Sequence, residues 1–178
     1  MQTLSHSFRF CPRCAAPNPA IKEERCLVCL HCDLTFYFNT AAAAGAFILY
    51  EDQVILCERA RDPKKGLIDI PGGFIEPGET VEEGLRREIY EEIHVDVGPL
   101  HYLGSAPNFY PYREVPYQTA DLFFVAPLAS LEGLKAQDDV ASIKRINPFS
   151  FNPADFAFDS TRLGFEYLLR HLVIFEDK

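Results

Sequence analysis

The feature that most restricts how this chain can fold is the crowding of its cysteines near the N-terminus. Five of the six cysteines lie in the stretches "CPRC" and "CLVCLHC", between residues 11 and 32. Paired C-x-x-C spacings of this kind are typical of tetrahedral zinc sites. The surrounding sequence has little hydrophobic periodicity, so we expect zinc to stabilise it as a small ribbon. The sequence therefore predicts a zinc ribbon over residues 1–38 and a separate domain over residues 39–178.

Two arrangements of cysteines could close this zinc site. Cys11 and Cys14 supply the first pair, and the second pair is either Cys26 with Cys29 or Cys29 with Cys32. We favour Cys29 and Cys32, because "CLHCDLTFYFN" continues as a ribbon-like strand after the second thiol. That choice leaves Cys26 outside the site. A site closed by four thiolates has no open position for catalysis, so we expect a structural zinc ion.

The second region alternates strand-like and helix-like segments. The apolar, β-rich runs "AGAFILY" and "QVILCER" are separated by "EDQ", which predicts a hairpin. Further strands are predicted in "LIDIPGGF", "LHYLGSA", "TADLFFVAPL" and, more weakly, "VASIKRI", with the Tyr- and Pro-rich stretch "PNFYPYREVPYQ" as a connection. Helical periodicity from Ser160 or Thr161 to about Phe175 predicts a C-terminal amphipathic helix. Together these elements indicate an α/β or α+β sandwich.

An acidic helix is predicted in the middle of this region. Thr80 and Glu83 have the T-x-x-E spacing of a capping box, so the helix should begin at about Val81. Its apolar stripe consists of Val81, Leu85, Ile89 and Ile93. On a helical wheel, Glu92 lies about 40° and Glu88 about 80° from the centre of this stripe. Glu91 lies about 140° away, beside Arg87. Two glutamates are therefore expected at the edge of the core.

The position of these glutamates indicates a metal site. Like charges one turn apart repel, and the repulsion grows as they lose water, unless a divalent cation lies between them. From Gly72 to Asp96 the chain has eight acidic residues against two arginines. Hard oxygen ligands favour Mg²⁺ or Mn²⁺ over zinc. A carboxylate-rich metal site facing a glycine turn is suited to phosphate chemistry.

The stretch "GGFIEPGETVEEGLRREIYEEIHV" resembles the Nudix box, G-x5-E-x7-R-E-U-x-E-E-x-G-U, where U is aliphatic. The matching residues are Gly73, Glu79, Arg87, Glu88, Ile89, Glu91, Glu92 and Val95. The departure is His94, which stands where the family has glycine. A glycine there follows the helix as a left-handed cap, and histidine tolerates that conformation better than most residues. We expect altered capping at His94 and an unchanged metal site.

The resemblance implies the Nudix α/β/α sandwich, a mixed sheet between helices, preceded here by a small zinc ribbon. It also implies hydrolysis of a nucleoside diphosphate derivative by attack of water on a phosphorus of the pyrophosphate. The implied metal ligands are Glu88, Glu91, Glu92 and the carbonyl of Gly72, with Arg87 and Glu79 orienting them. The implied catalytic base is Glu88 or an acid of a later loop, for which we favour Asp139 over Asp138 and Glu114.

A zinc ribbon before a Nudix domain is similar to the NADH pyrophosphatase branch. That branch carries the motif S-Q-P-W-P-F-P-x-S after the box, whereas the stretch "GSAPNFYPYREVPYQT" lacks the Gln and the Trp. The resemblance therefore does not single out NADH, and the expected substrate is NADH, ADP-ribose or a related nucleotide. Aromatic residues of this stretch could stack on a base or ribose, with an arginine near a phosphate. The aromatics are Phe109, Tyr110, Tyr112 and Tyr117, and the arginine is Arg113. The alternative is that these aromatics cover the sheet.

Charge and hydropathy restrict the partners. The net charge of −9 makes nucleic acid and anionic membranes unlikely partners, since both attract basic surfaces. The longest apolar run, "AAAAGAFILY", is much shorter than the roughly 20 residues that span a bilayer. The C-x-x-C pairs indicate a reducing, cytoplasmic location. A homodimer is compatible with the sequence. The alternative function is a noncatalytic nucleotide-sensing regulator, against which the complete set of acidic residues argues.

Overall fold

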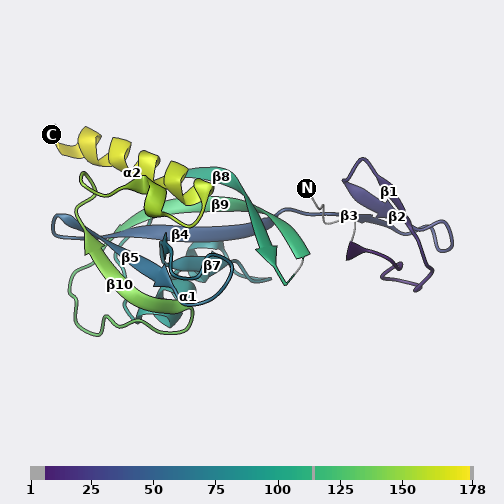
Figure 1. Cartoon of the computed structure of the whole chain (residues 1–178), viewed down its shortest axis with the longest axis horizontal. Coiled ribbons are helices and arrows are strands. Elements are labelled where there is room, and N and C mark those ends of the chain that lie inside the picture. Colours follow the sequence, from purple (N-terminus) through teal and green to yellow (C-terminus); the bar gives the residue numbers. More distant parts are fainter. Residues whose placement is uncertain (1–6, 114, 177–178) are drawn as a thin grey trace. The chain divides into compact units, whose positions relative to one another are not determined.

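The computed structural model describes residues 7–113 and 115–176 (Figure 1). Glu114, one of the alternatives for the catalytic base, lies outside these ranges. The chain divides into two compact units. The first comprises Met1–Thr40 and Phe109–Gln118, and the second comprises Ala41–Asn108 and Thr119–Lys178. The two units are described separately below.

The first unit contains the ribbon, a small antiparallel sheet with strand order β1-β2-β3. The strands are β1 Ala20–Lys22, β2 Cys26–Val28 and β3 Thr35–Tyr37. Strand β3 follows the last ribbon cysteine, as predicted. Leu27 is fully buried beside Cys11 and Cys29. So small a core buries too little apolar surface to fold a segment of this length alone, which makes a metal the natural source of its stability.

The second unit is built on a mixed sheet with strand order β10-β5-β4-β9-β8, in which β6 pairs with β5 and β7 with β4. The strands are β4 Ala41–Tyr50, β5 Gln53–Arg59, β6 Ile68–Asp69, β7 Gly72–Phe74, β8 His101–Tyr112, β9 Val115–Pro127 and β10 Val140–Ile146. The end of β8 from Phe109 and the start of β9 to Gln118 belong to the first unit. Strands β4 and β5 form the predicted antiparallel hairpin. Strand β4 also pairs in parallel with β9, so the sheet is mixed.

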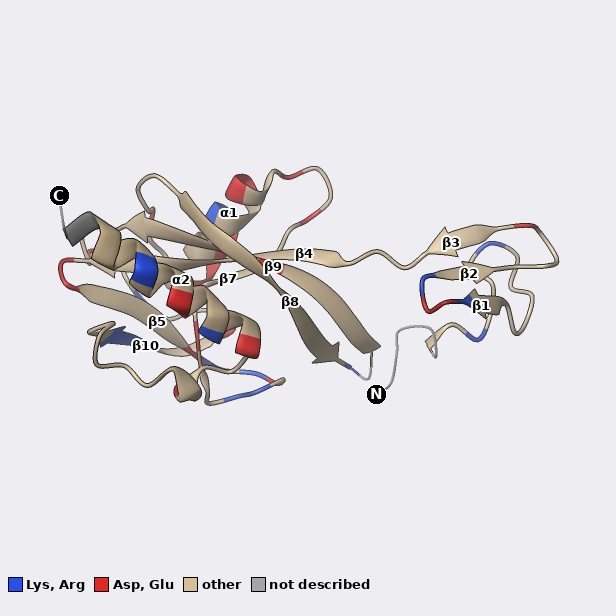
Figure 2. Cartoon of the chain, turned by 90° about the horizontal axis from the view of Figure 1, so that it is seen from above, with Lys and Arg blue, Asp and Glu red and all other residues tan. Residues whose placement is uncertain are grey.

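Helices cover both faces of this sheet. They are α1 Val81–Ile93 and α2 Asp159–Glu176, with a short 3-10 helix, η2, at Pro153–Asp155. Both α-helices carry acidic and basic residues (Figure 2). Alternate residues of β4 face opposite layers: Ile48 packs in the core with Ile89 of α1, whereas Phe47 packs with Phe165 of α2. Figure 1 shows α1 and α2 on opposite sides of the sheet. The predicted α/β/α sandwich is confirmed.

One secondary-structure prediction is wrong. The Tyr- and Pro-rich stretch expected as a loop belongs to the paired strands β8 and β9, which continue through it to residues 112 and 115. Proline lacks the N–H needed inside a ladder and is therefore confined to edge strands. Strand β8 is the terminal strand of the sheet order, so it can accommodate Pro107 and Pro111.

The N-terminus of α1 forms as the capping box predicts, whereas the altered capping expected at His94 is not observed, because His94 forms the left-handed cap itself. At the N-terminus the Thr80 hydroxyl accepts from the Glu83 N–H, and the Glu83 carboxylate accepts from the Thr80 N–H at 2.8 Å. At the C-terminus His94 has the left-handed conformation, with φ 58° and ψ 41°, and its N–H donates to the Tyr90 carbonyl. The imidazole also lies against the Tyr90 ring, with centroids 4.6 Å apart. Histidine therefore performs the capping role for which glycine is the commonest residue.

Candidate active site

The turn before α1 brings the backbone of β7 against the helix carboxylates. Gly72 has φ 148°, a conformation that favours glycine, and a Cβ there would overlap the Ala44 carbonyl. Its N–H donates to Glu92 Oε2 at 2.9 Å. A Cβ on Gly73 would lie 2.5 Å from Glu88 Cδ. Gly72 thus allows β7 to approach β4 closely, and Gly73 leaves room for the Glu88 carboxylate beside the strand.

Arg87 connects the remaining acidic residues. Its Nε and Nη2 donate to the two carboxylate oxygens of Glu79, at 2.7 and 3.0 Å. Its Nη1 donates to Glu88 at 2.8 Å and to Glu91 at 3.2 Å. This bidentate contact lowers the pKa of Glu79 to about 2, and the hydrogen bonds to the acids raise the pKa of Arg87. The guanidinium therefore holds the carboxylates of Glu79, Glu88 and Glu91 around itself.

The three glutamates differ in their exposure to water. The Glu91 side chain is 49% exposed and that of Glu88 is 19% exposed. Burial, with smaller contributions from the charges of Glu88, Asp69 and Asp139, raises the pKa of Glu92 to about 8. Burial also raises the pKa of Glu88. The division that the helical wheel predicted, with Glu88 and Glu92 toward the core and Glu91 on the flank, is therefore present in the structure.

The donor set of this helix fits a hard divalent cation. All the side-chain donors are carboxylate oxygens, the ligands that Mg²⁺ and Mn²⁺ prefer. Without a cation, Arg87 and the Gly72 N–H satisfy these oxygens. The raised pKa values of Glu88 and Glu92 show that ionisation is unfavourable there without added positive charge. A bound cation would supply that charge.

We expect the metal-free protein to lose stability as the pH rises. The pKa of Glu92 is about 8 in the folded protein, against an ordinary value of 4.5. Between these values the folded state holds a proton that the unfolded state has released, so the free energy of unfolding decreases with increasing pH. This contribution is complete below about pH 4.5 and is lost above about pH 8. Thermal unfolding in a chelator from pH 5 to 8 measures the trend.

Two comparisons sharpen that measurement. Mg²⁺ binds the ionised carboxylates, so its addition should raise the melting temperature most at the alkaline end of the range. Replacing Glu92 with glutamine should reduce the slope of melting temperature against pH. An unchanged slope in that variant would assign the pH dependence to other groups.

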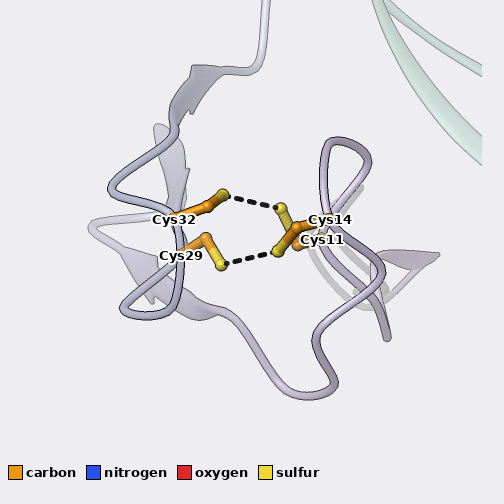
Figure 3. Close-up of side chains that lie close together, drawn as sticks. All are labelled: Cys11, Cys14, Cys29 and Cys32. Atoms are coloured by element: carbon orange, nitrogen blue, oxygen red, sulfur yellow. Dashed lines mark hydrogen bonds between the residues drawn. The ribbon is translucent and has the colours of Figure 1, made fainter.

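The four predicted zinc ligands are brought together in the ribbon. The Sγ atoms of Cys11, Cys14, Cys29 and Cys32 all lie within 4.8 Å of one another. Figure 3 shows the two pairs facing each other, with Sγ–Sγ distances of 3.7 Å for Cys11–Cys32 and 3.6 Å for Cys14–Cys29. Among the residues that the structure describes, this is the group suited to hold a metal ion by that criterion. Cys26 is buried in β2 and outside the group.

The predicted substrate-binding residues belong to the first unit. Phe109, Tyr110, Tyr112 and Arg113 are at the end of β8 and in the turn that follows. The Tyr110 and Tyr112 rings stack with centroids 6.4 Å apart, and the Arg113 guanidinium lies 5.2 Å from the centre of the Tyr112 ring. The glutamates belong to the second unit.

A buried polar network near the start of α2 was missed by sequence reasoning. Asp69 accepts from Arg59 at 2.9 Å and from Thr161 at 3.1 Å, and Asp121 accepts from Ser160 at 2.7 Å. These contacts fix the first turn of α2 to the sheet. The partners are far apart in the sequence, and no local motif marks them. Only the tertiary structure reveals the network.

Comparison with known families identifies the two regions of the chain. The family described as "NUDIX domain" matches residues 39–170, and the family described as "NADH pyrophosphatase zinc ribbon domain" matches residues 6–37. The chain belongs to the Nudix family. Its Nudix domain contains Glu88, Glu91 and Glu92, which we call the glutamate site. The matched ribbon contains the four clustered cysteines, which supports a structural zinc ion there.

Curated relatives match the chain at moderate identity. The chain is 30% identical over 153 residues to the NAD-capped RNA hydrolase NudC of Pseudomonas putida W619, covering 85% of this chain and 52% of that protein. It is 35% identical over 144 residues to the protein of the same name from Pseudomonas putida KT2440, covering 80% and 49%. The chain therefore spans about half the length of these relatives.

Solved structures show the same fold. A NUDIX hydrolase from Nitrosomonas europaea matches with a TM-score of 0.69 and 24% identity, covering 92% of this chain and 93% of that one. The NUDIX domain of Shewanella oneidensis NrtR, solved with ADP ribose, matches with a TM-score of 0.60 and 20% identity, covering 76% and 90%. Within the described residues, no helix is long and apolar enough to cross a membrane.

Proposed function

We propose that this Nudix domain hydrolyses the pyrophosphate bond of a nucleoside diphosphate derivative with the help of Mg²⁺ or Mn²⁺. The observation that carries the proposal is Glu92, whose buried carboxylate contacts the Gly72 N–H and has a pKa raised to about 8. Ionising a buried carboxylate is unfavourable unless a cation binds beside it, so a strongly raised pKa of this kind marks a candidate functional site. The cation would offset the phosphate charge, polarise a phosphoryl oxygen and acidify a bound water.

The chain's own residues then have separate roles. Glu88, Glu91, Glu92 and the Gly72 carbonyl would hold the cation. Arg87, which contacts Glu88 and Glu91, orients their carboxylates, and Glu79 fixes Arg87 from the other side. Asp139 is our choice for the base that accepts the proton of the attacking water. Phe109, Tyr110, Tyr112 and Arg113 remain our proposal for binding the nucleotide.

The substrate is proposed from the relatives and from the resemblance. NADH and ADP-ribose are small nucleotides with the required bond. The relatives, however, are named NAD-capped RNA hydrolases, which gives no support to the expectation that nucleic acid is an unlikely partner. We therefore include capped RNA among the candidates. No comparison supports the alternative of a noncatalytic regulator.

A substrate panel tests the proposed function. Purified protein with Mg²⁺ or Mn²⁺ is incubated with NADH, NAD⁺, ADP-ribose, a sugar nucleotide and an NAD-capped oligoribonucleotide. We expect release of a mononucleotide, or of a 5′-monophosphorylated RNA, that a chelator abolishes. A nucleotide monophosphate without a pyrophosphate serves as the negative control. Tight nucleotide binding without turnover of any compound would instead favour the regulator.

A further inference from the structure

The acidic segment immediately before β10, residues 137–139, lies against the glutamate site. The Gln137 N–H donates to the Glu92 carbonyl at 2.8 Å, which fixes the segment to the last turn of α1. The Ala60 N–H donates to the Asp139 carbonyl at 2.8 Å, which fixes it to the end of β5. Asp139 is also among the charges that raise the pKa of Glu92. The backbone therefore places the Asp139 carboxylate within electrostatic reach of the site.

Arg61, in the loop after β5, contacts the carboxylates of Asp138 and Asp139 in this segment. Its Nη1 lies 2.5 Å from Asp139 Oδ1, and its Nη2 donates to Asp138 Oδ1 at 3.3 Å. The rigid guanidinium fork fixes both carboxylates in direction as well as in distance. The Arg61 side chain is 64% exposed, and ion pairs of this exposure contribute little to stability. Its contact with Asp139 is thus better suited to orientation than to folding.

We propose that Arg61 is a positioning residue that holds the Asp139 carboxylate at the glutamate site. The inference rests on the proposed function. In the step concerned, the water oxygen forms a bond to phosphorus while its proton passes to Asp139. The bond from phosphorus to the bridging oxygen breaks, and its electron pair leaves with the departing phosphate. Arg61 holds Asp139 in place to receive the proton, and placement is the first requirement of a general base.

A double-mutant cycle tests this role. We expect Arg61→Ala to lower kcat about tenfold while KM changes less than about threefold, because the substrate itself is still bound. Arg61→Lys, which keeps one charged donor, should restore part of kcat. Asp139→Asn should lower kcat at least as much as Arg61→Ala. The double variant should be no slower than Asp139→Asn, because Arg61 acts through Asp139.

The matched control is Arg170→Ala. Arg170 is 70% exposed and forms an ion pair with Glu166 on α2, so its loss should leave kcat unchanged. Melting temperatures of all variants should lie within a few degrees of the parent. The inference would be overturned if the fold losses in kcat of the two single variants multiplied in the double variant, or if Arg61→Ala changed KM alone. Either result would leave the proposed function intact. A wild-type protein inactive on the whole panel would overturn both.

Discussion

Replacing Glu92 with glutamine is expected to lower kcat at least about a hundredfold, because it removes a carboxylate that would bind the catalytic cation. Glutamine has the same shape and still offers an oxygen to the Gly72 N–H, which Glu92 now contacts at 2.9 Å. The substitution also removes a buried charge. The metal-free variant should therefore be at least as stable as the parent near pH 8, where Glu92 is about half ionised. Loss of activity with retained stability distinguishes a metal ligand from a structural residue.

Glu82→Gln is the matched control for that experiment. Glu82 lies on the exposed side of the same helix, so the change removes an equal charge without touching the site. Initial rates at saturating substrate, with Mg²⁺ varied, should separate the two variants. The increase in melting temperature on adding Mg²⁺ should also be smaller for Glu92→Gln than for Glu82→Gln. A loss of activity below threefold in Glu92→Gln would mean that α1 is not the metal site.

Removal of one ribbon thiolate is expected to unfold the ribbon. We expect Cys32→Ser to lower zinc affinity at least about a thousandfold, since binding free energies of about 10–16 kcal/mol are typical of structural zinc sites. The metal is the main source of order in this segment, whose buried core contains little beyond Leu27 and two of the cysteines. Metal analysis should show the loss of one zinc ion per chain. Limited proteolysis should become rapid within residues 7–40.

Cys26→Ser is the comparison that assigns the fourth ligand. Cys26 is buried in β2 but lies outside the group of sulfur atoms, so this variant should retain its zinc. The free energy of unfolding should fall only by the cost of burying a hydroxyl in place of a thiol, about 1–3 kcal/mol. Retained zinc in Cys32→Ser, together with loss of zinc in Cys26→Ser, would reverse the assignment.

Local signals predicted the elements that carry the proposed chemistry. The capping box located the first residue of α1, and its apolar stripe located the sides on which Glu88, Glu91 and Glu92 lie. Such features succeed because their partners are within one or two turns of the helix, where geometry follows directly from the spacing of residues. The clustered cysteines were informative for the same reason, since a metal site needs particular ligands at short spacing.

Features that depend on distant partners could not be predicted. Whether Pro107 and Pro111 lie in a loop or a strand depends on β8 being the edge of the sheet, which no local pattern reveals. The contact between Arg61 and Asp139 forms because β5 and β10 are neighbours in the sheet. The aromatic residues predicted to stack on a base or ribose belong to the first unit, and their role remains a prediction.

The parallel pairing of β4 with β9 has a consequence for the order of folding. The neighbours of β4 on one side, β5 and β7, follow it closely in the chain, whereas β9 comes only after α1 and β8. Contacts between distant segments form slowly, because a long loop must close first. During synthesis, the first half of the domain should therefore collapse early and leave one side of β4 unpaired. Until β9 arrives, that open edge is the part of the nascent chain most exposed to aggregation.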